Sequence, residues 1–210
     1  MTGQDTHEFS GLKGRFFAWF LTSPLRKVLE MKMGKPEERI TELLGLTGTE
    51  RVLDFGSGSG FHSLLMAEKL PEGQVVAVDI SPEMLDQLRT NAQRRGLADR
   101  IEVLQADGLD LPLEDASVDR ALSAAVWRHH DDPDQACREL VRALKPGGRA
   151  VVSDLAIEAN TKAVKGLDGH DVAFGPADMK RIMENAGLTD VTVETVGRWV
   201  LGAGTKPAAT

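Results

Sequence analysis

The sequence lacks several features that would place it in a specialised class of protein. It has a single cysteine, Cys137, which excludes an internal disulfide and any Cys-x-x-Cys metal or redox site and fits a reducing cytoplasm. It has no excess of basic residues, because 25 Lys and Arg face 32 Asp and Glu, for a net charge of −7. No basic stripe offsets this acidity, so a nucleic-acid partner is disfavoured.

Long apolar runs and segment-dividing compositions are missing as well. The apolar patch near the N-terminus is shorter than a membrane-spanning helix and shows no signal-peptide cleavage pattern. No internal repeat, low-complexity stretch or Pro/Ser-rich linker divides the chain. With 41 % apolar and 27 % charged residues over 210 positions, the composition predicts one soluble globular domain in the cytoplasm, without stable membrane insertion.

Short, nearly continuous apolar runs alternate with longer helical patterns between Arg51 and Asp154. This alternation is typical of βαβ units, and strands that are apolar at most positions are those of a parallel sheet buried on both faces. Near the C-terminus only Gly197 separates two β-rich runs, which predicts an antiparallel hairpin. The predicted strands are 51–55, 74–80, 101–107, 118–124, 149–154, 190–196 and 198–204. The predicted helices are 36–46, 61–70, 81–97, 134–148 and 177–187.

Half of the aromatic residues lie in the first twenty positions. They are Phe9, Phe16, Phe17, Trp19 and Phe20, five of ten in the protein. We therefore separate an N-terminal helical extension, residues 1–35, from a main domain of residues 36–206. Three interpretations of the extension stay open: a helix packed on the sheet, a lid over an active site, or a weak contact with a membrane surface.

Three glycines, Gly56, Gly58 and Gly60, directly follow the first predicted strand and precede a helix. Glycine at such a place lets the chain turn sharply and lets a ligand approach the backbone. The second strand ends in Asp79, whose carboxylate suits the two hydroxyls of a ribose. The third strand leads to Asp107, which suits the amino group of a purine. These strand ends converge at one edge of the sheet, so the sequence predicts a nucleoside-shaped ligand there.

Two details distinguish between nucleotide ligands. A dinucleotide fingerprint needs glycine at position 61, where the chain has Phe61, and no P-loop Gly-Lys-Ser/Thr is present. The loop follows Asp54 and has no basic residue, which disfavours a pyrophosphate but suits the ammonium and sulfonium of S-adenosylmethionine. A nicotinamide-dependent oxidoreductase and a non-catalytic ligand-binding protein of the same fold stay open as alternatives.

Four motifs together resemble the class I S-adenosylmethionine-dependent methyltransferases, especially the small-molecule enzymes of the ubiquinone and menaquinone type. They are VLDFGSGSG, AVDISPEML, LQADGLDLPLEDASVD and ELVRALKPGGR. The resemblance covers about residues 36–206. It implies a Rossmann-like α/β fold with a seven-stranded, mostly parallel sheet in the order 3-2-1-4-5-7-6. It also implies S-adenosyl-L-methionine as cofactor and methyl transfer to a small-molecule acceptor.

The resemblance also assigns roles to single residues. The methionine part of the cofactor falls to Asp54, Phe55, Gly56, Ser57, Gly58 and Gly60, the ribose to Asp79, and the adenine to Ile80, Asp107 and Gly108. We add Met84, Ala106 and Ser123 to the cofactor-binding candidates. Ser57 stands where the family often has Cys or Ala. Purely structural roles stay open for the three acids: a strand-end cap for Asp54, a helix-entry residue for Asp79 and a turn former for Asp107.

Methyl transfer from a sulfonium is an in-line displacement, so it needs alignment in a dry pocket and no covalent nucleophile. A histidine base assists when the acceptor is a hydroxyl or an acidic carbon. The candidates are His129, on the loop after the fourth strand, and His170; a structural role stays open for each. We expect His130 to mark a helix entry and expect no metal site at this histidine pair. The acceptor's identity and the choice between monomer and homodimer are left open.

Overall fold

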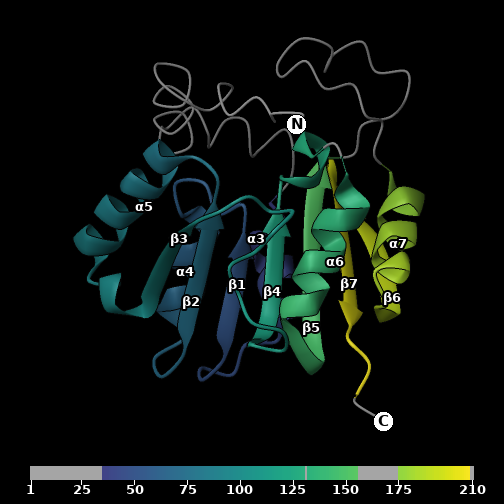
Figure 1. Cartoon of the computed structure of the whole chain (residues 1–210), viewed down its shortest axis with the longest axis horizontal. Helices are drawn as coiled ribbons and strands as arrows, with labels where there is room; N and C mark the ends of the chain where they lie inside the picture. Colours follow the sequence, from purple (N-terminus) through teal and green to yellow (C-terminus); the bar gives the residue numbers. More distant parts are fainter. Residues whose placement is uncertain (1–34, 131, 156–174, 209–210) are drawn as a thin grey trace.

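The computed structural model describes residues 35–130, 132–155 and 175–208. They form a seven-stranded sheet in the order β3-β2-β1-β4-β5-β7-β6, parallel except for β7 (Figure 1). The strands are β1 Arg51–Phe55, β2 Gln74–Asp79, β3 Ile101–Gln105, β4 Val118–Ala124, β5 Leu144–Leu155, β6 Thr189–Val196 and β7 Trp199–Thr205. The predicted fold and strand order are confirmed. The aromatic extension and His170 lie outside the described residues.

Helices cover both faces of the sheet. They are α3 Glu37–Leu44, α4 Phe61–Lys69, α5 Pro82–Arg95, α6 Pro133–Ala143 and α7 Pro176–Asn185, with short 3₁₀ turns η1 Ala98–Arg100 and η2 Trp127–His129. Side chains of α6 and α7 join one apolar core, and side chains of α3, α4 and α5 join the other. Because strand side chains alternate, Leu53 and Phe55 enter the first core while Val52 enters the second.

Local sequence signals explain where the helices begin. The Ser81 hydroxyl accepts a hydrogen bond from the Met84 amide at 3.3 Å, and Pro82 occupies the first helical position of α5, as predicted. At α6 the cap is Asp132, whose carboxylate accepts from the Gln135 amide at 2.8 Å. The expectation that His130 marks this helix entry is therefore wrong, because the nearer carboxylate is the stronger cap.

Two predicted boundaries shift. The helix predicted over 134–148 ends at Ala143, and β5 begins at Leu144 instead of Arg149. The hairpin turn contains Arg198 as well as Gly197, because Val196 pairs with Trp199. Neither shift moves a residue of the predicted site.

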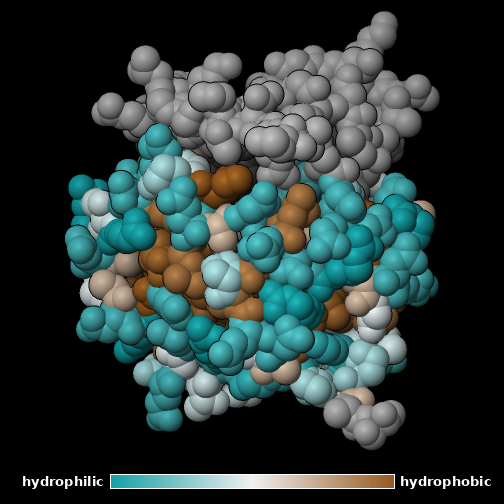
Figure 2. Space-filling view, viewed as in Figure 1, coloured by the Kyte–Doolittle hydropathy of each residue, from teal (hydrophilic) through white to brown (hydrophobic). Residues whose placement is uncertain are grey.

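The connection between β3 and β4, residues 106–117, contains no helix. On the face that carries α6 and α7 it covers the sheet with apolar side chains that are only partly buried, including Ala106, Leu109 and Leu113. Figure 2 shows apolar side chains reaching the surface on this face. The connection therefore needs another means of attachment.

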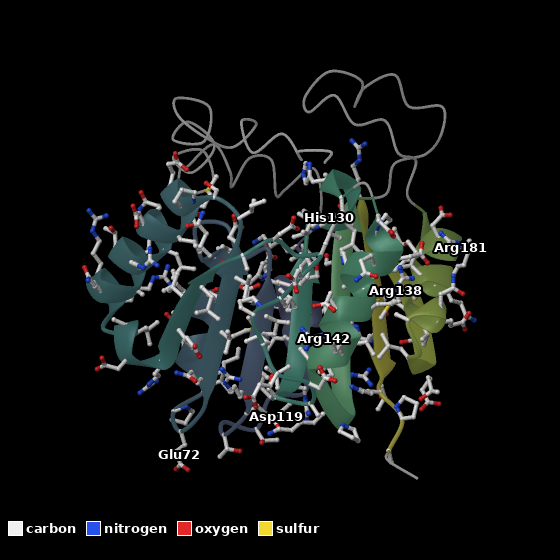
Figure 3. All side chains as sticks on the ribbon, viewed as in Figure 1. Glu72, Asp119, His130, Arg138, Arg142 and Arg181 are labelled. Carbon is white, nitrogen blue, oxygen red and sulfur yellow. The ribbon has the colours of Figure 1, made fainter. Side chains whose placement is uncertain are left out.

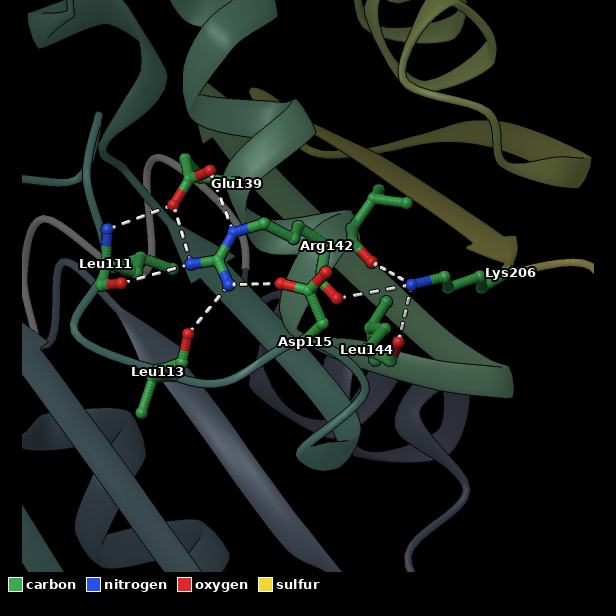
Figure 4. A network of polar contacts seen from close by, with 8 residues as sticks. Leu111, Leu113, Asp115, Glu139, Arg142, Leu144 and Lys206 are labelled. Atoms are coloured by element: carbon green, nitrogen blue, oxygen red, sulfur yellow. Dashed lines mark hydrogen bonds and ion pairs between the residues drawn. The ribbon is translucent and has the colours of Figure 1, made fainter.

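Arg142 supplies that attachment (Figure 4). Its guanidinium donates to the carbonyl oxygens of Leu111 and Leu113 at 3.0 and 2.7 Å and pairs with Glu139 and Asp115. The Glu139 carboxylate also accepts from the Leu111 amide at 3.0 Å. One side chain of α6 thus holds the connection that begins at the carboxyl end of β3.

We predict that Arg142→Ala lowers the free energy of unfolding by about 2 kcal/mol, because it leaves backbone carbonyls and Glu139 without their charged donor. Arg138→Ala on the same helix is the matched control; its side chain is 49 % exposed, so its loss should cost about 0.5 kcal/mol or less. Urea denaturation measures both. Equal losses in the two variants would contradict the attachment role.

Candidate functional site

The loops that follow β1, β2, β3 and β4 meet at one edge of the sheet, because these strands are parallel and adjacent. Figure 3 shows His130 at this carboxyl edge, while Glu72 and Asp119 lie at the opposite edge. The predicted cofactor residues are divided among these loops and the ends of the strands that lead into them. Open α/β sheets bind their ligands at this place.

The glycine loop is held by backbone hydrogen bonds and by packing. The amides of Gly56 and Ser57 both donate to the carbonyl of Val78, at 2.8 and 2.9 Å. A Cβ on Gly56 would lie 2.4 Å from Cγ2 of Val126, and one on Gly60 would lie 2.6 Å from Cγ of Leu88. Packing therefore excludes any side chain at these two positions.

Gly58 differs from the other two loop glycines. It has a φ of +53°, and a Cβ placed on it would meet nothing within 4 Å. Its backbone therefore faces space that the described protein leaves open. A ligand that contacts the loop backbone fits at this point.

Two carboxylates flank the loop, Asp54 buried and Asp79 partly buried. Asp54, at 1 % exposure, accepts a hydrogen bond from the Ser63 hydroxyl. Asp79 accepts from the amides of Gly58 and Ser81 at 2.8 and 2.9 Å. Burial, reinforced by the nearby charge of Asp79, raises the pKa of Asp54 to about 7. Burial also raises the pKa of Asp79 above its ordinary value. Such a pair favours a ligand with positive charge.

The end of β3 supplies the third part of the predicted site. The Ala106 amide donates to the Asp79 carbonyl at 3.1 Å, which joins this segment to the end of β2. Asp107 Oδ1 accepts from the Leu109 amide at 3.0 Å. Asp107 is therefore a turn former, the structural role left open above, and its ligand role stays a prediction.

Sequence reasoning missed the place of His130. Its ring lies against Phe55, with centroids 5.7 Å apart and planes tilted by 54°. A Cβ on Gly108 would come within 2.4 Å of Cζ of Phe55 and 3.0 Å of Cε1 of His130. The loop after β4 thus packs against the segment after β3. The adjacent histidines could have indicated that one of them packs inside the protein. Consecutive side chains diverge, so only one of the two can face an acceptor.

The loop after β4 leaves the strand through a strained residue. Ala125 has a φ of +62°, which is unusual for a residue other than glycine, and its amide donates to the Ser153 carbonyl at 2.7 Å. His129 follows in η2, half-buried, and its amide donates to the Val126 carbonyl at 2.9 Å. The predicted catalytic candidate therefore sits on a loop that is anchored to β5.

The remaining candidates support the site from below or beside it. Phe55 and Met84 are 1 % and 3 % exposed, so their side chains belong to the protein interior. Ile80 is half-buried, and its carbonyl accepts from the Gln105 side chain at 3.2 Å.

Buried polar atoms without a hydrogen-bond partner gather at the same edge. Within the described ranges they include Ser57 Oγ in the glycine loop, Ser123 Oγ in β4, Ser153 Oγ in β5 and Trp199 Nε1 in β7. Leaving such a group unsatisfied costs about 1–3 kcal/mol. A concentration of them at the ligand edge indicates positions that bound molecules satisfy.

The described residues hold neither a metal-binding cluster nor a membrane-spanning helix. No group of three or more His, Cys, Asp or Glu side chains in them is arranged to hold a metal ion. None of the helices within those ranges combines the length and apolar character that crossing a bilayer requires.

Comparison with known proteins gives consistent matches. A family model described as a methyltransferase domain matches residues 53–152. The chain is 35 % identical over 164 residues to the ubiquinone/menaquinone biosynthesis C-methyltransferase UbiE of Pseudomonas entomophila. That match covers 77 % of this chain and 64 % of the relative, so the chain spans less than two thirds of that protein's length.

Solved structures share the fold. A SAM-dependent methyltransferase from Aquifex aeolicus matches with a TM-score of 0.74 and 26 % identity, over 90 % of this chain and 96 % of that one. The [4+2]-cyclase SpnF matches with a TM-score of 0.73 and 20 % identity, over 82 % and 80 %. The second likeness concerns the fold alone.

The pKa of Asp54 predicts a pH-dependent stability. The folded protein retains a proton up to about pH 7, whereas an unfolded Asp loses it near pH 3.9, so this contribution is present at low pH and is lost as the pH rises through 7. Asp54→Asn mimics the neutral form. We predict that, from pH 5 to pH 8, the wild type loses about 2–3 kcal/mol of unfolding free energy relative to this variant.

Urea denaturation across this range measures the difference. Asp119→Asn is the control, because ion pairing with Lys145 and other contacts lower the pKa of Asp119, so its effect should be constant above pH 5. A constant difference for Asp54→Asn would mean that Asp54 is already ionised at pH 5.

Proposed function

The chain belongs to the class I S-adenosylmethionine-dependent methyltransferases, and on that premise we propose that it transfers the methyl group of S-adenosylmethionine to a small-molecule acceptor. The observation that carries this proposal is a pair of carboxylates, the buried Asp54 and the partly buried Asp79, beside a loop that is open at Gly58. The pair suits a ligand that carries an ammonium and a sulfonium. The similarities to known proteins favour neither an oxidoreductase nor a non-catalytic binder.

The described residues fit this cofactor in three places. The loop 56–60, with Asp54 beneath it, would hold the methionine part, because its backbone is accessible at Gly58. Asp79 would accept hydrogen bonds from the ribose hydroxyls. Asp107 and Gly108 would lie at the adenine, in a segment joined to β2 through the Ala106 amide. When bound, the cofactor supplies an electrophilic methyl group on a sulfonium.

The contribution of the chain to the reaction is mainly positioning. A displacement at carbon requires the nucleophile, methyl group and sulfur in line, in a pocket without water. The anchored loop after β4 would form one wall of this pocket. We propose that His129, on this loop, takes the proton from a hydroxyl or carbon acceptor. His170 remains a second candidate outside the described residues.

Further aspects of the proposal rest on the sequence. We propose a cytoplasmic enzyme, because the chain has one cysteine. A nucleic-acid acceptor is disfavoured, because the sequence has no basic stripe. The choice between a monomer and a homodimer is left open. Residues 1–35, rich in aromatics, are proposed as a helical extension packed on the sheet or a lid that excludes water, with the membrane-surface contact as a further alternative. The relative from Pseudomonas entomophila methylates carbon according to its name. The atom methylated here is left open.

Asp79→Asn should weaken adenosylhomocysteine binding by about 1–3 kcal/mol, because the ribose loses a charged acceptor in a buried site. Isothermal titration calorimetry measures this change. Asp119→Asn, at the opposite edge of the sheet, should bind as the wild type does. Unchanged affinity in folded Asp79→Asn would remove the ribose assignment.

Gly58→Val should abolish adenosylhomocysteine binding and the transfer of labelled methyl groups into a small-molecule cell extract. Gly45 is the matched control, since it also has a positive φ, +60°, and open space around a Cβ. Both valine variants should lose about 1–2 kcal/mol of stability through backbone strain. Only Gly58→Val should lose the ligand. Normal binding and transfer in that variant would sink the proposed function.

A further inference from the structure

Two of the unsatisfied buried polar atoms lie beyond the residues that suit the cofactor. They are Ser153 Oγ in β5 and Trp199 Nε1 in β7. Ser153 is 1 % exposed. An indole N–H is a donor only, and a buried one normally has an acceptor. Among the described residues neither atom has a hydrogen-bond partner.

Strand register places the two side chains on one face. In the β5–β7 pair Ser153 lies opposite Leu201, and Leu155 lies opposite Trp199. Val151 and Leu201 both belong to the core formed with α3, α4 and α5. Ser153 and Trp199 are each two residues away from one of these, so they share that face as diagonal cross-strand neighbours.

The pair also adjoins the proposed reaction site. Ser153 is joined to the loop after β4 through its carbonyl, which accepts a hydrogen bond from the Ala125 amide at 2.7 Å. In the sheet, β5 is separated from β1 only by β4. Adjacent strands are about 4.8 Å apart, so Ser153 lies about 10 Å from the strand that carries the glycine loop. A small acceptor that lies over β4 and β5 reaches both Ser153 and the glycine loop.

The chemistry of the surroundings limits what the pair would bind. A hydroxyl and an indole N–H both donate, so they suit an oxygen with free lone pairs. Anions are disfavoured because Asp54 is buried and Asp79 is partly buried at the same edge. The partly buried side chains of Ala124 and Val196 give the pair apolar neighbours.

We propose that Ser153 and Trp199 form an acceptor subsite that binds an uncharged oxygen, carbonyl or hydroxyl, of a largely apolar methyl acceptor. This inference rests on the proposed function, because it specifies the acceptor of that same site. The pair would hold the part of the acceptor that lies farthest from the cofactor. The Ser153–Trp199 pair is therefore separate from the base that the loop after β4 would supply.

Nuclear magnetic resonance of the indole N–H groups tests the subsite directly. The chain has three tryptophans, and Trp199→Phe identifies the signal of Trp199 by its loss. In protein saturated with adenosylhomocysteine, 1-naphthol should shift this signal downfield, whereas naphthalene, which has no oxygen, should not produce that shift. No shift with 1-naphthol, or the same shift with naphthalene, would overturn the proposal and leave buried water as the partner of the indole.

Affinity measurements add a matched set of variants. Ser153→Ala and Trp199→Phe should each weaken 1-naphthol binding about fivefold to tenfold and leave adenosylhomocysteine affinity within twofold. Ser117→Ala is the control, because Ser117 Oγ is also buried without a partner but lies just before β4, away from this edge. A loss of adenosylhomocysteine affinity in the two subsite variants would assign the pair to the cofactor instead.

The proposed function and the subsite fail in different ways. If the wild type does not bind adenosylhomocysteine, the proposed function fails, and the 1-naphthol titration of the free protein still decides the subsite. If adenosylhomocysteine binds but the Trp199 signal does not respond to 1-naphthol, only the subsite is wrong.

Discussion

Two carboxylates at the ends of neighbouring strands, Asp54 buried and Asp79 partly buried, impose the central constraint on this structure. Burial of Asp54 and Asp79 disfavours their charged forms, and their proximity adds repulsion. The protein offsets part of this cost with the Ser63 hydroxyl and with the amides of Gly58 and Ser81. The part of this electrostatic cost that the hydrogen bonds do not offset is reduced further when a cation binds nearby. The glycine loop, which the Asp79 carboxylate holds in place, is where such a cation has access.

The loops around this pair depend on one another through close packing. Gly56 lies against Val126 of the loop after β4, and Gly108 lies against both Phe55 and His130. Each contact leaves no room for a Cβ, so each loop is shaped by a neighbour from another strand. The loops after β1, β3 and β4 are therefore packed against one another. A ligand that orders one loop limits the freedom of the others, because packed interiors transmit displacement.

The fold and the convergence of the glycine loop with the acidic strand ends could be predicted because their signals are local in sequence. Apolar runs, a glycine loop and acids at strand ends lie in continuous segments, and the family resemblance supplied the strand order. His130 could not be placed in this way, since its contact with Phe55 joins residues 75 positions apart and depends on the exit angle from Ala125. Likewise Ser153 and Trp199 are unremarkable in sequence. Only the register of β5 with β7 makes them neighbours.

The division of the edge explains how one fold carries different reactions. The [4+2]-cyclase with a similar fold shows that the sheet alone does not determine the chemistry. Here β1, β2 and β3 supply the acids and glycines that suit a cationic nucleoside, whereas β4, β5 and β7 supply a strained loop, a histidine and two unsatisfied donors. The first half makes few demands on the acceptor. Selection among acceptors must therefore come from the second half, which holds the unsatisfied donors of Ser153 and Trp199.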